Sequence, residues 1–292
     1  MSNLCYTILM DLTLPKIIKE LLAKYETKAS KGLGQNFLID KNVLEKIINS
    51  ADIKTDDIIL EVGPGLGTLT QELASRAGQV IAVEKDKTMV EILKETLKNF
   101  KNVEVIQGDI LTSPRLARLG RENYKIIANI PYYLTSPLIR KFLEAENPPT
   151  EMILMLQKEV AKRICAKPGQ MSLLAVSVQF YAEPKIISYV SKNCFWPAPK
   201  VDSAIIKITP FGAAQGKKQI SRDLFFEVVK AGFSQPRKQL VNNLTTLKSL
   251  NGVKLTKEQT SKWLLKNNLE PSQRAETLAV SDWINLSKNF NE

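Results

Sequence analysis

The sequence predicts an α/β protein in which a doubly wound parallel sheet with helices on both faces is followed by a small all-helical domain. Three observations predict this fold. Short β-branched or apolar runs alternate with helix-like segments over most of the chain. No convincing strand pattern is found after residue 211, where helical spacing takes over. The 292 residues also exceed a typical domain of roughly 100 to 150, so one large domain and one smaller domain are expected.

The elements follow in order. Residues 14–26 have the apolar spacing of an amphipathic helix, and a polar, lysine-rich stretch leads from there into the sheet. Helix-like segments such as 69–77 and 87–100 separate the first strands, which favours crossover connections between parallel strands. The predicted strands are 58–62, 79–84, 103–108, 125–130, 152–157 and 204–211.

The GAAQGKKQ stretch at 212–219 is small, polar and basic, which is typical of a linker. Beyond it, residues 221–290 include Trp263 and Trp283 at helical spacing. We therefore expect three parts, namely an N-terminal extension (1–27), a main domain (28–212) and a helical domain (213–292).

Composition narrows the function classes. Forty-one Lys and Arg against thirty Asp and Glu give a net charge of +11, which favours a nucleic-acid partner, although a merely basic soluble protein is the alternative. The chain has no histidine, which excludes Ser-His-Asp and Cys-His nucleophiles and His-dependent zinc sites.

Cys5, Cys165 and Cys194 are odd in number and far apart, so we expect reduced thiols. No apolar run approaches the ~20 residues of a membrane span, and the N-terminus lacks a basic signal region, so we expect a cytoplasmic protein without membrane contact.

Chemically selective residues follow each of the first three strands, where an open α/β sheet binds its ligands. Gly63, Gly65 and Gly67 permit a tight turn, and Thr68 stands where a dinucleotide fingerprint needs its third glycine. This form is similar to the loop of class I methyltransferases that holds an amino-acid tail, while a turn that merely requires glycine is the alternative.

The next two strand ends extend the pattern. Glu84 could accept hydrogen bonds from both ribose hydroxyls of an adenosine, Asp109 could accept from an adenine amine, and Ile110 could pack on the ring. Taken alone, Glu84 could instead be a solvated residue at a strand end, and Asp109 could be an ordinary turn residue. Together the three strand ends indicate a ligand made of adenosine and an amino-acid tail.

The fourth strand runs into NIPYYLTSP at 129–137, the most specific pattern in the chain. An arylamine such as adenine N6 is a weak nucleophile because its lone pair is delocalised into the ring. The side chain of Asn129 and a backbone carbonyl, of Ile130 or Pro131, could each accept one amine hydrogen and localise that pair. Tyr132 offers a face on which an extruded base could stack. A strand end followed by a buried tyrosine pair is the alternative. No strong base or metal is needed, because water can take the proton.

With these motifs, the chain resembles the ribosomal RNA adenine dimethyltransferase family, in its small-subunit branch, over roughly residues 28–290. GQNFLID at 34–40, LQKEVAKRI at 156–164, FWPAPKVDSA at 195–204 and GFSQPRKQLVNNL at 232–244 also carry the resemblance. It implies a class I methyltransferase, Rossmann-like fold and S-adenosylmethionine as cofactor. The cofactor contacts that it implies are Gln35, Asn36, Leu38, Gly63, Gly65, Glu84, Lys85, Asp109, Ile110 and Asn129.

The resemblance also implies the substrate. Methyl groups would pass to N6 of two adjacent adenines in a 16S rRNA hairpin of the immature small ribosomal subunit, with the enzyme a metal-free monomer. Phe195 would close the target base from the side opposite Tyr132, although core packing is an equal alternative. Arg237 and Lys238, at the start of an expected helix, would meet phosphate or else form a solvated face.

Three other functions stay open. A large-subunit (23S) rRNA methyltransferase of the macrolide-resistance type shares the fold and the chemistry. A non-catalytic nucleic-acid-binding factor could have kept the fold, against which Glu84 and Asp109 argue. A nicotinamide-dependent oxidoreductase is disfavoured by Thr68. The sequence departs from the usual family pattern in its long N-terminal segment and in Trp196.

Overall fold

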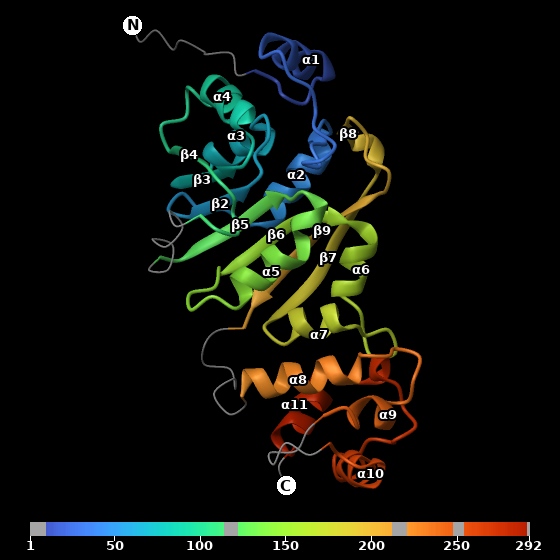
Figure 1. Cartoon of the computed structure of the whole chain (residues 1–292). Coiled ribbons are helices and arrows are strands. Elements are labelled where there is room, and N and C mark those ends of the chain that lie inside the picture. Colours follow the sequence, from blue (N-terminus) through green and yellow to red (C-terminus); the bar gives the residue numbers. More distant parts are fainter. Residues whose placement is uncertain (1–9, 114–121, 212–220, 248–253, 291–292) are drawn as a thin grey trace, which may run out of the picture. The chain divides into compact units, whose positions relative to one another are not determined.

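The computed structural model describes residues 10–113, 122–211, 221–247 and 254–290, and it divides into two compact units (Figure 1). Unit 1 comprises Met1–Ala161 and Lys185–Thr209, and unit 2 comprises Lys162–Pro184 and Pro210–Glu292. Cys5 and the expected linker lie outside the described residues. The two described cysteines, Cys165 and Cys194, are free thiols. Among the described helices, none combines the length and the apolar character of a membrane span.

A seven-stranded sheet in the order β4-β3-β2-β5-β6-β9-β7 forms the centre of unit 1. The five strands from β4 to β6 are parallel, which confirms the predicted doubly wound core, whereas β9 runs antiparallel to β6. All six predicted strands are present. Their bounds are β2 Ile58–Val62, β3 Gln79–Glu84, β4 Val103–Gln107, β5 Tyr124–Asn129, β6 Glu151–Gln157 and β9 Ser203–Pro210.

Three strands were not predicted. β7 (Ala182–Val190) lies at the edge of the sheet, where its exposed positions are polar or mixed and Pro184 is tolerated, so its pattern is weak. β1 (Phe37–Leu38) and β8 (Phe195–Trp196) are two residues long and pair antiparallel as a separate ribbon. Such short strands leave no periodic signal.

Two helices of unit 1 begin at aspartate caps. Asp40 accepts from Val43 N at 3.1 Å to start α2, and Asp86 accepts from Thr88 N at 2.9 Å to start α4. Gly67, at φ +96°, starts α3. The helices are α2 Lys41–Ser50, α3 Thr68–Ala74, α4 Lys87–Thr96, α5 Thr135–Leu143 and α6 Lys158–Ile164, the last three residues of which belong to unit 2. Helices α2 and α3 bury their apolar faces in one cluster with the sheet.

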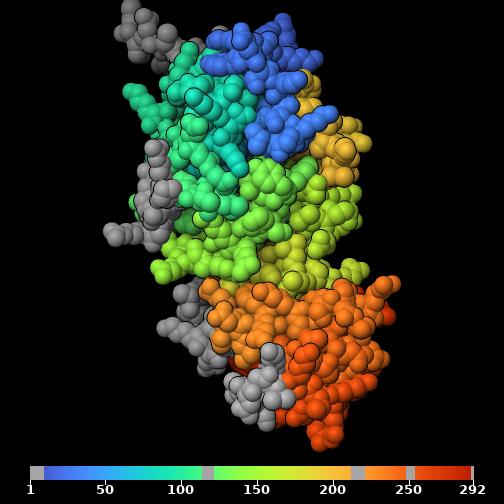
Figure 2. All heavy atoms as spheres, in the orientation of Figure 1, coloured from blue at the N-terminus to red at the C-terminus, as the bar shows by residue number. Residues whose placement is uncertain are grey.

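The described part of the expected N-terminal extension is built into unit 1. Helix α1 (Pro15–Lys24) buries Ile18, Leu21 and Leu22 in a cluster with Phe37, Leu66, Met89 and Ile92. Lys24 Nζ and Tyr25 Oη donate to Glu95 Oε2 on α4 at 2.6 and 2.8 Å. In the space-filling view this blue segment lies directly against the teal region of α4 (Figure 2). An amphipathic pattern shows that a helix has an apolar face but not where that face docks.

Unit 2 is built from α7 (Leu173–Gln179), α8 (Arg222–Gly232), α9 (Leu240–Leu244), α10 (Lys257–Lys266) and α11 (Val280–Lys288). It also takes in residues 162–184, which the predicted boundary at 213 assigns to the main domain. The reason is aromatic packing, since Phe180 stacks on Phe225 of α8 with ring centroids 4.0 Å apart. Trp283 is fully buried, and a β-carbon at Gly232 would lie 2.3 Å from its ring.

Candidate active site

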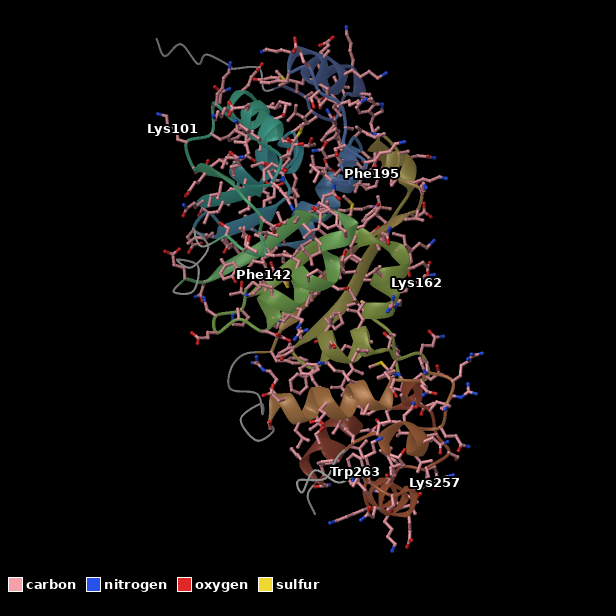
Figure 3. The ribbon with its side chains drawn as sticks, in the orientation of Figure 1. Lys101, Phe142, Lys162, Phe195, Lys257 and Trp263 are labelled. Atoms are coloured by element: carbon pink, nitrogen blue, oxygen red, sulfur yellow. The ribbon has the colours of Figure 1, made fainter. Side chains whose placement is uncertain are left out.

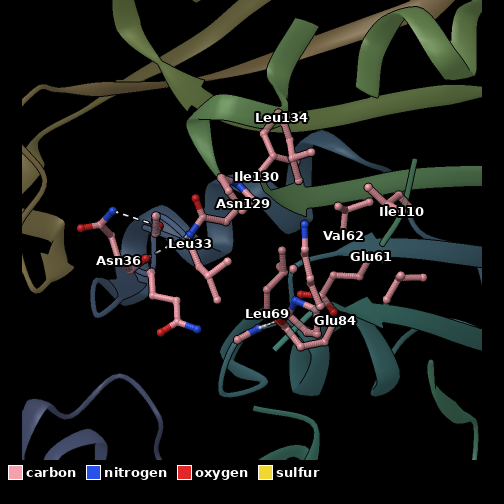
Figure 4. A pocket seen from close by; sticks show the side chains of 18 of the residues that line it. Leu33, Asn36, Glu61, Val62, Leu69, Glu84, Ile110, Asn129, Ile130 and Leu134 are labelled. Carbon is pink, nitrogen blue, oxygen red and sulfur yellow. Dashed lines mark hydrogen bonds between the residues drawn. The ribbon is translucent and has the colours of Figure 1, made fainter. Parts of the chain in front are cut away.

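A pocket lies beyond the carboxyl ends of β2, β3, β4 and β5, and its walls come from the segments that follow these strands together with β1 and β8 (Figure 4). The structure brings together there all of the predicted cofactor and catalytic residues, and Phe195 as well. They are Gln35, Asn36, Leu38, Gly63, Gly65, Glu84, Lys85, Asp109, Ile110, Asn129, Ile130, Pro131 and Tyr132. Arg237 and Lys238 are in unit 2.

Two glycines shape the pocket wall. Gly63 and Gly65 adopt φ values of +67° and +59°, which disfavour other residues. A β-carbon at Gly63 would lie 3.3 Å from Pro131 Cδ, and one at Gly65 would lie 3.2 Å from Phe37 Cε1. The loop after β2 therefore passes close against both neighbouring walls and presents bare backbone to the cavity.

Glu84 is 7% exposed at the end of β3. Its oxygens accept from Asp86 N at 2.9 Å and Gly65 N at 3.2 Å, so the carboxylate is fixed against the glycine loop. Burial raises the pKa of Glu84, and these N–H groups oppose that rise. A carboxylate has about four acceptor sites, so hydroxyl groups of a ligand could still be bound.

Asp109, after β4, is held from two sides. Leu111 N donates to its Oδ1 at 2.9 Å, and Lys85 Nζ lies 3.0 Å from its Oδ2. The Leu111 hydrogen bond and then the Lys85 contact lower the pKa of Asp109, which keeps it an acceptor. Lys85 thus reaches the pocket as the partner of Asp109, while Ile110 is 3% exposed beside it.

The segment before β1 is tied to two strand ends. Gln35 Nε2 donates to Asp86 Oδ2 at 2.9 Å, and Gln35 Oε1 accepts from Ser30 N at 2.8 Å. The carbonyl of Asn36 accepts from Asn129 Nδ2 at 3.4 Å. Both polar ends of Gln35 are therefore engaged within the protein, which indicates that it positions this segment.

The conformation of the loop after β5 shows which of the predicted acceptor oxygens remain available to a ligand. Because Asn129 Nδ2 faces the Asn36 carbonyl, Oδ1 is the atom of that side chain left to accept from a ligand (Figure 4). Leu134 N donates to the Pro131 carbonyl at 2.9 Å in the 3₁₀ turn η2 (Tyr132–Leu134). Of the two predicted backbone acceptors, the Ile130 carbonyl is thus the one outside this turn.

Two aromatic rings flank this loop. The hydroxyl groups of Tyr132 and Ser203, on β9, are 2.9 Å apart, and burial raises the pKa of Tyr132. Phe195 is 3% exposed in β8 (Figure 3). It packs in the core cluster, which confirms core packing, and it also lines the pocket, while contact with a target base stays a prediction.

Glu61 was not predicted from the sequence as a site residue. This residue of β2 lines the pocket, is 1% exposed, and its Oε2 has no hydrogen-bond partner in the described structure. Burial raises its pKa to about 8. A carboxylate in the apolar run IILEV, two residues before the first loop glycine, was the available signal. Tyr133 was also missed; it lines the pocket and is 51% exposed.

Arg237 and Lys238 are exposed in a turn that ends before α9 starts at Leu240, rather than at the start of a helix as predicted. The turn is pinned from inside unit 2, because the buried Asn243 Nδ2 donates to the Gly232 carbonyl at 2.6 Å and the Gln235 carbonyl at 3.0 Å. Within the described ranges, no group of three or more His, Cys, Asp or Glu side chains could hold a metal ion.

The model of the family described as ribosomal RNA adenine dimethylase matches residues 26–289. A protein of Dehalococcoides mccartyi named ribosomal RNA small subunit methyltransferase A is 45% identical over 277 residues, covering 94% of this chain and 92% of that protein.

Two solved structures are similar over most of the chain. A dimethyladenosine transferase from Plasmodium falciparum aligns with a TM-score of 0.70 and 28% identity over 86% of this chain and 95% of that one. The 23S rRNA methyltransferase ErmE aligns with a TM-score of 0.68 and 26% identity over 87% and 99%.

Proposed function

The chain belongs to the ribosomal RNA adenine dimethylase family, and from this premise we propose that it dimethylates N6 of two adjacent adenines in a 16S rRNA hairpin of the immature small subunit. The observation that carries the proposal is the loop after β5. There the Asn129 amide nitrogen is committed to Asn36, which leaves Oδ1 and the Ile130 carbonyl as neighbouring acceptors beside the cofactor pocket.

The pocket residues fit S-adenosylmethionine. Glu84 would hold the ribose hydroxyls, Asp109 would accept from the adenine amine, and Ile110 would cover the ring. Gly63 and Gly65 would let the backbone approach the amino-acid end, and Glu61 Oε2, which has no hydrogen-bond partner in the described structure, would face its ammonium group. When bound, this cofactor supplies an electrophilic methyl group carried on a sulfonium.

The protein's part in the chemistry is positioning and hydrogen bonding. Asn129 Oδ1 and the Ile130 carbonyl each accept one N6 hydrogen, which localises the nitrogen lone pair toward the donor. Tyr132, anchored through Ser203, offers its face to the flipped base, and Phe195 bounds the other side. The amine becomes acidic once alkylated, so its proton passes to water without a histidine.

The remaining residues and partners follow from this reaction. Gln35, Asn36 and Leu38 would close the cofactor side of the pocket, with Lys85 holding Asp109. Arg237 and Lys238, on the pinned turn of unit 2, would contact phosphates of the folded RNA. We propose a metal-free monomer that works in the cytoplasm, where the small subunit is assembled.

A second candidate function on the same fold is methylation of large-subunit RNA, which the structural similarity to ErmE supports. The small-subunit assignment is favoured by relatives of that name at 45% identity, against 26% for ErmE. The test is incubation with labelled donor and either undermethylated small subunits or protein-free large-subunit RNA, followed by nucleoside analysis. We expect N6,N6-dimethyladenosine only in the small subunit. Label in the large-subunit RNA, or calorimetry that detects no donor binding, would refute the proposal.

A further inference from the structure

A second hollow of unit 1 lies outside the cofactor pocket. Its residues come from the end of β6, from the 3₁₀ turn η3 (Lys192–Cys194) and from the connection between β8 and β9. We call it the lysine groove, after Lys158, Lys192 and Lys200. The other lining residues are Gln157, Glu159, Val201 and Asp202.

The charges in the lysine groove leave two cations available. Asp202 is engaged, because its Oδ2 lies 3.6 Å from Lys158 Nζ and its Oδ1 accepts from Lys192 N at 3.2 Å. Glu159 also has an interaction partner. The ammonium groups of Lys192 and Lys200 are exposed and have no acidic partner among the described residues. An anion can therefore bind here without displacing an ion pair.

An exposed aromatic ring lies beside Lys158 of the lysine groove. Tyr189 of β7 is 53% exposed, and Lys158 Nζ lies 5.4 Å from its ring centroid. Ile187 on the same strand and Val201 in the groove are 38% and 44% exposed. An exposed aromatic ring beside cations is the composition with which proteins bind single-stranded nucleic acid, because bases stack on the ring while phosphates meet the charges.

The lysine groove adjoins the place proposed for the target base. Gln157 of β6 pairs with Ser203 of β9, whose hydroxyl group is the one that anchors Tyr132. Asp202 of the groove directly precedes Ser203, and η3, which carries Lys192, leads directly into Phe195 of the pocket. The groove and the pocket therefore share the end of one strand pair.

We propose that the lysine groove binds the nucleotide next to the target adenine, with its phosphate on Lys192 and Lys200 and its base on Tyr189. This inference rests on the proposed function, because it assumes an RNA adenine in the pocket. It assigns to unit 1 a role in holding the RNA strand beside the flipped base, apart from the contacts proposed for unit 2.

The charge part is tested with the double variant Lys192→Gln and Lys200→Gln in the full-length protein. Its control is Lys98→Gln with Lys101→Gln, which removes the same charge between α4 and β4, at the opposite edge of the sheet. For undermethylated small subunits, the groove variant should reduce the salt slope of binding by about 1.4, at roughly 0.7 per lost single-strand phosphate contact. KM for subunits should rise, with kcat at saturation and donor affinity unchanged. Equal slopes for the groove and control variants would overturn the proposal.

The location is tested by placing the photo-cross-linker p-benzoylphenylalanine at position 189. We expect cross-links to nucleotides directly flanking the dimethylated adenines, mapped by primer extension, and a roughly tenfold higher KM for Tyr189→Leu. If the protein methylates the adenines normally but cross-links to a remote RNA helix, to a ribosomal protein or to nothing, the groove assignment is wrong. If the wild-type protein methylates no adenine, the proposed function itself fails.

Discussion

Glu61→Gln tests the proposed cofactor site directly. The carboxyl group is 1% exposed and burial raises its pKa to about 8, so at pH 6.5 it is almost fully protonated in the ligand-free protein. A cation bound beside it favours the ionised form. Binding of S-adenosylmethionine at pH 6.5 should therefore release about one proton from Glu61.

The affinity should show the same linkage. Ionising the group below its pKa costs about 1.4 kcal/mol per pH unit, so donor affinity of the wild-type protein should rise about tenfold between pH 6 and pH 7. Glutamine keeps the shape but does not titrate. The variant should lose this rise, and at pH 7.5 it should bind the donor about 2 kcal/mol more weakly or worse, as when one partner of a buried charge pair is removed.

Donor affinity should rise with pH, whereas the folding stability of the ligand-free protein should fall. The folded-state pKa of Glu61 lies above its ordinary value of 4.5, so the ligand-free protein loses stability as pH rises from 4.5 to about 8. The loss amounts to about 1.4 kcal/mol per pH unit within that window. The free energy of unfolding of Glu61→Gln, relative to wild type, should therefore increase between pH 5 and pH 8.

The assay is isothermal titration calorimetry in two buffers of different ionisation enthalpy, which counts the protons released. The matched control is Glu45→Gln, on the exposed face of α2, which should behave as wild type. The reasoning is refuted if the wild-type protein releases no proton at pH 6.5, or if Glu61→Gln releases as many as the wild type and binds as tightly.

Three further outcomes are expected. Asn129→Ala should lose about a hundredfold or more in kcat, because it removes an acceptor, while calorimetry finds donor binding little changed; near-normal turnover would remove the proposed role. Arg237→Glu with Lys238→Glu should weaken RNA binding and lower its salt slope, and an unchanged slope would place the turn away from RNA. Gly232→Ala should lower the free energy of unfolding by about 1 to 3 kcal/mol in urea titrations, because the new methyl group overlaps Trp283; wild-type stability would contradict this packing.

Most of the sheet could be predicted because buried parallel strands are continuous apolar runs. The runs 58–62 and 79–84 match β2 and β3 in both bounds. Strand β7 was not predicted because one of its faces is solvated and Pro184 lies within it. The docking of α1 and the grouping of residues 162–184 with unit 2 depend on tertiary partners such as Phe225, which no local pattern identifies.

The pocket residues could be predicted because parallel strands bring their carboxyl ends to one edge, so chemistry read at separate strand ends meets in space. The choice between the Ile130 and Pro131 carbonyls needed the η2 turn, which depends on the hydrogen bond of Leu134. Glu61 was missed because a single acidic residue in an apolar strand has no recognisable pattern in the sequence. Its proposed role became visible only from its burial and from the missing hydrogen-bond partner of Oε2.

The aromatic stack of Phe180 on Phe225 joins two stretches of chain that are synthesised at different times during translation. Residues 162–184 are synthesised first, and Phe180 stays without the ring of Phe225 until the strands that complete unit 1 and then α8 have been made. A chain cut after Thr209 would carry Phe180 without α8, and a transplanted tail from Pro210 onward would lack Phe180. Exchange of unit 2 between relatives therefore requires that both stretches be moved together.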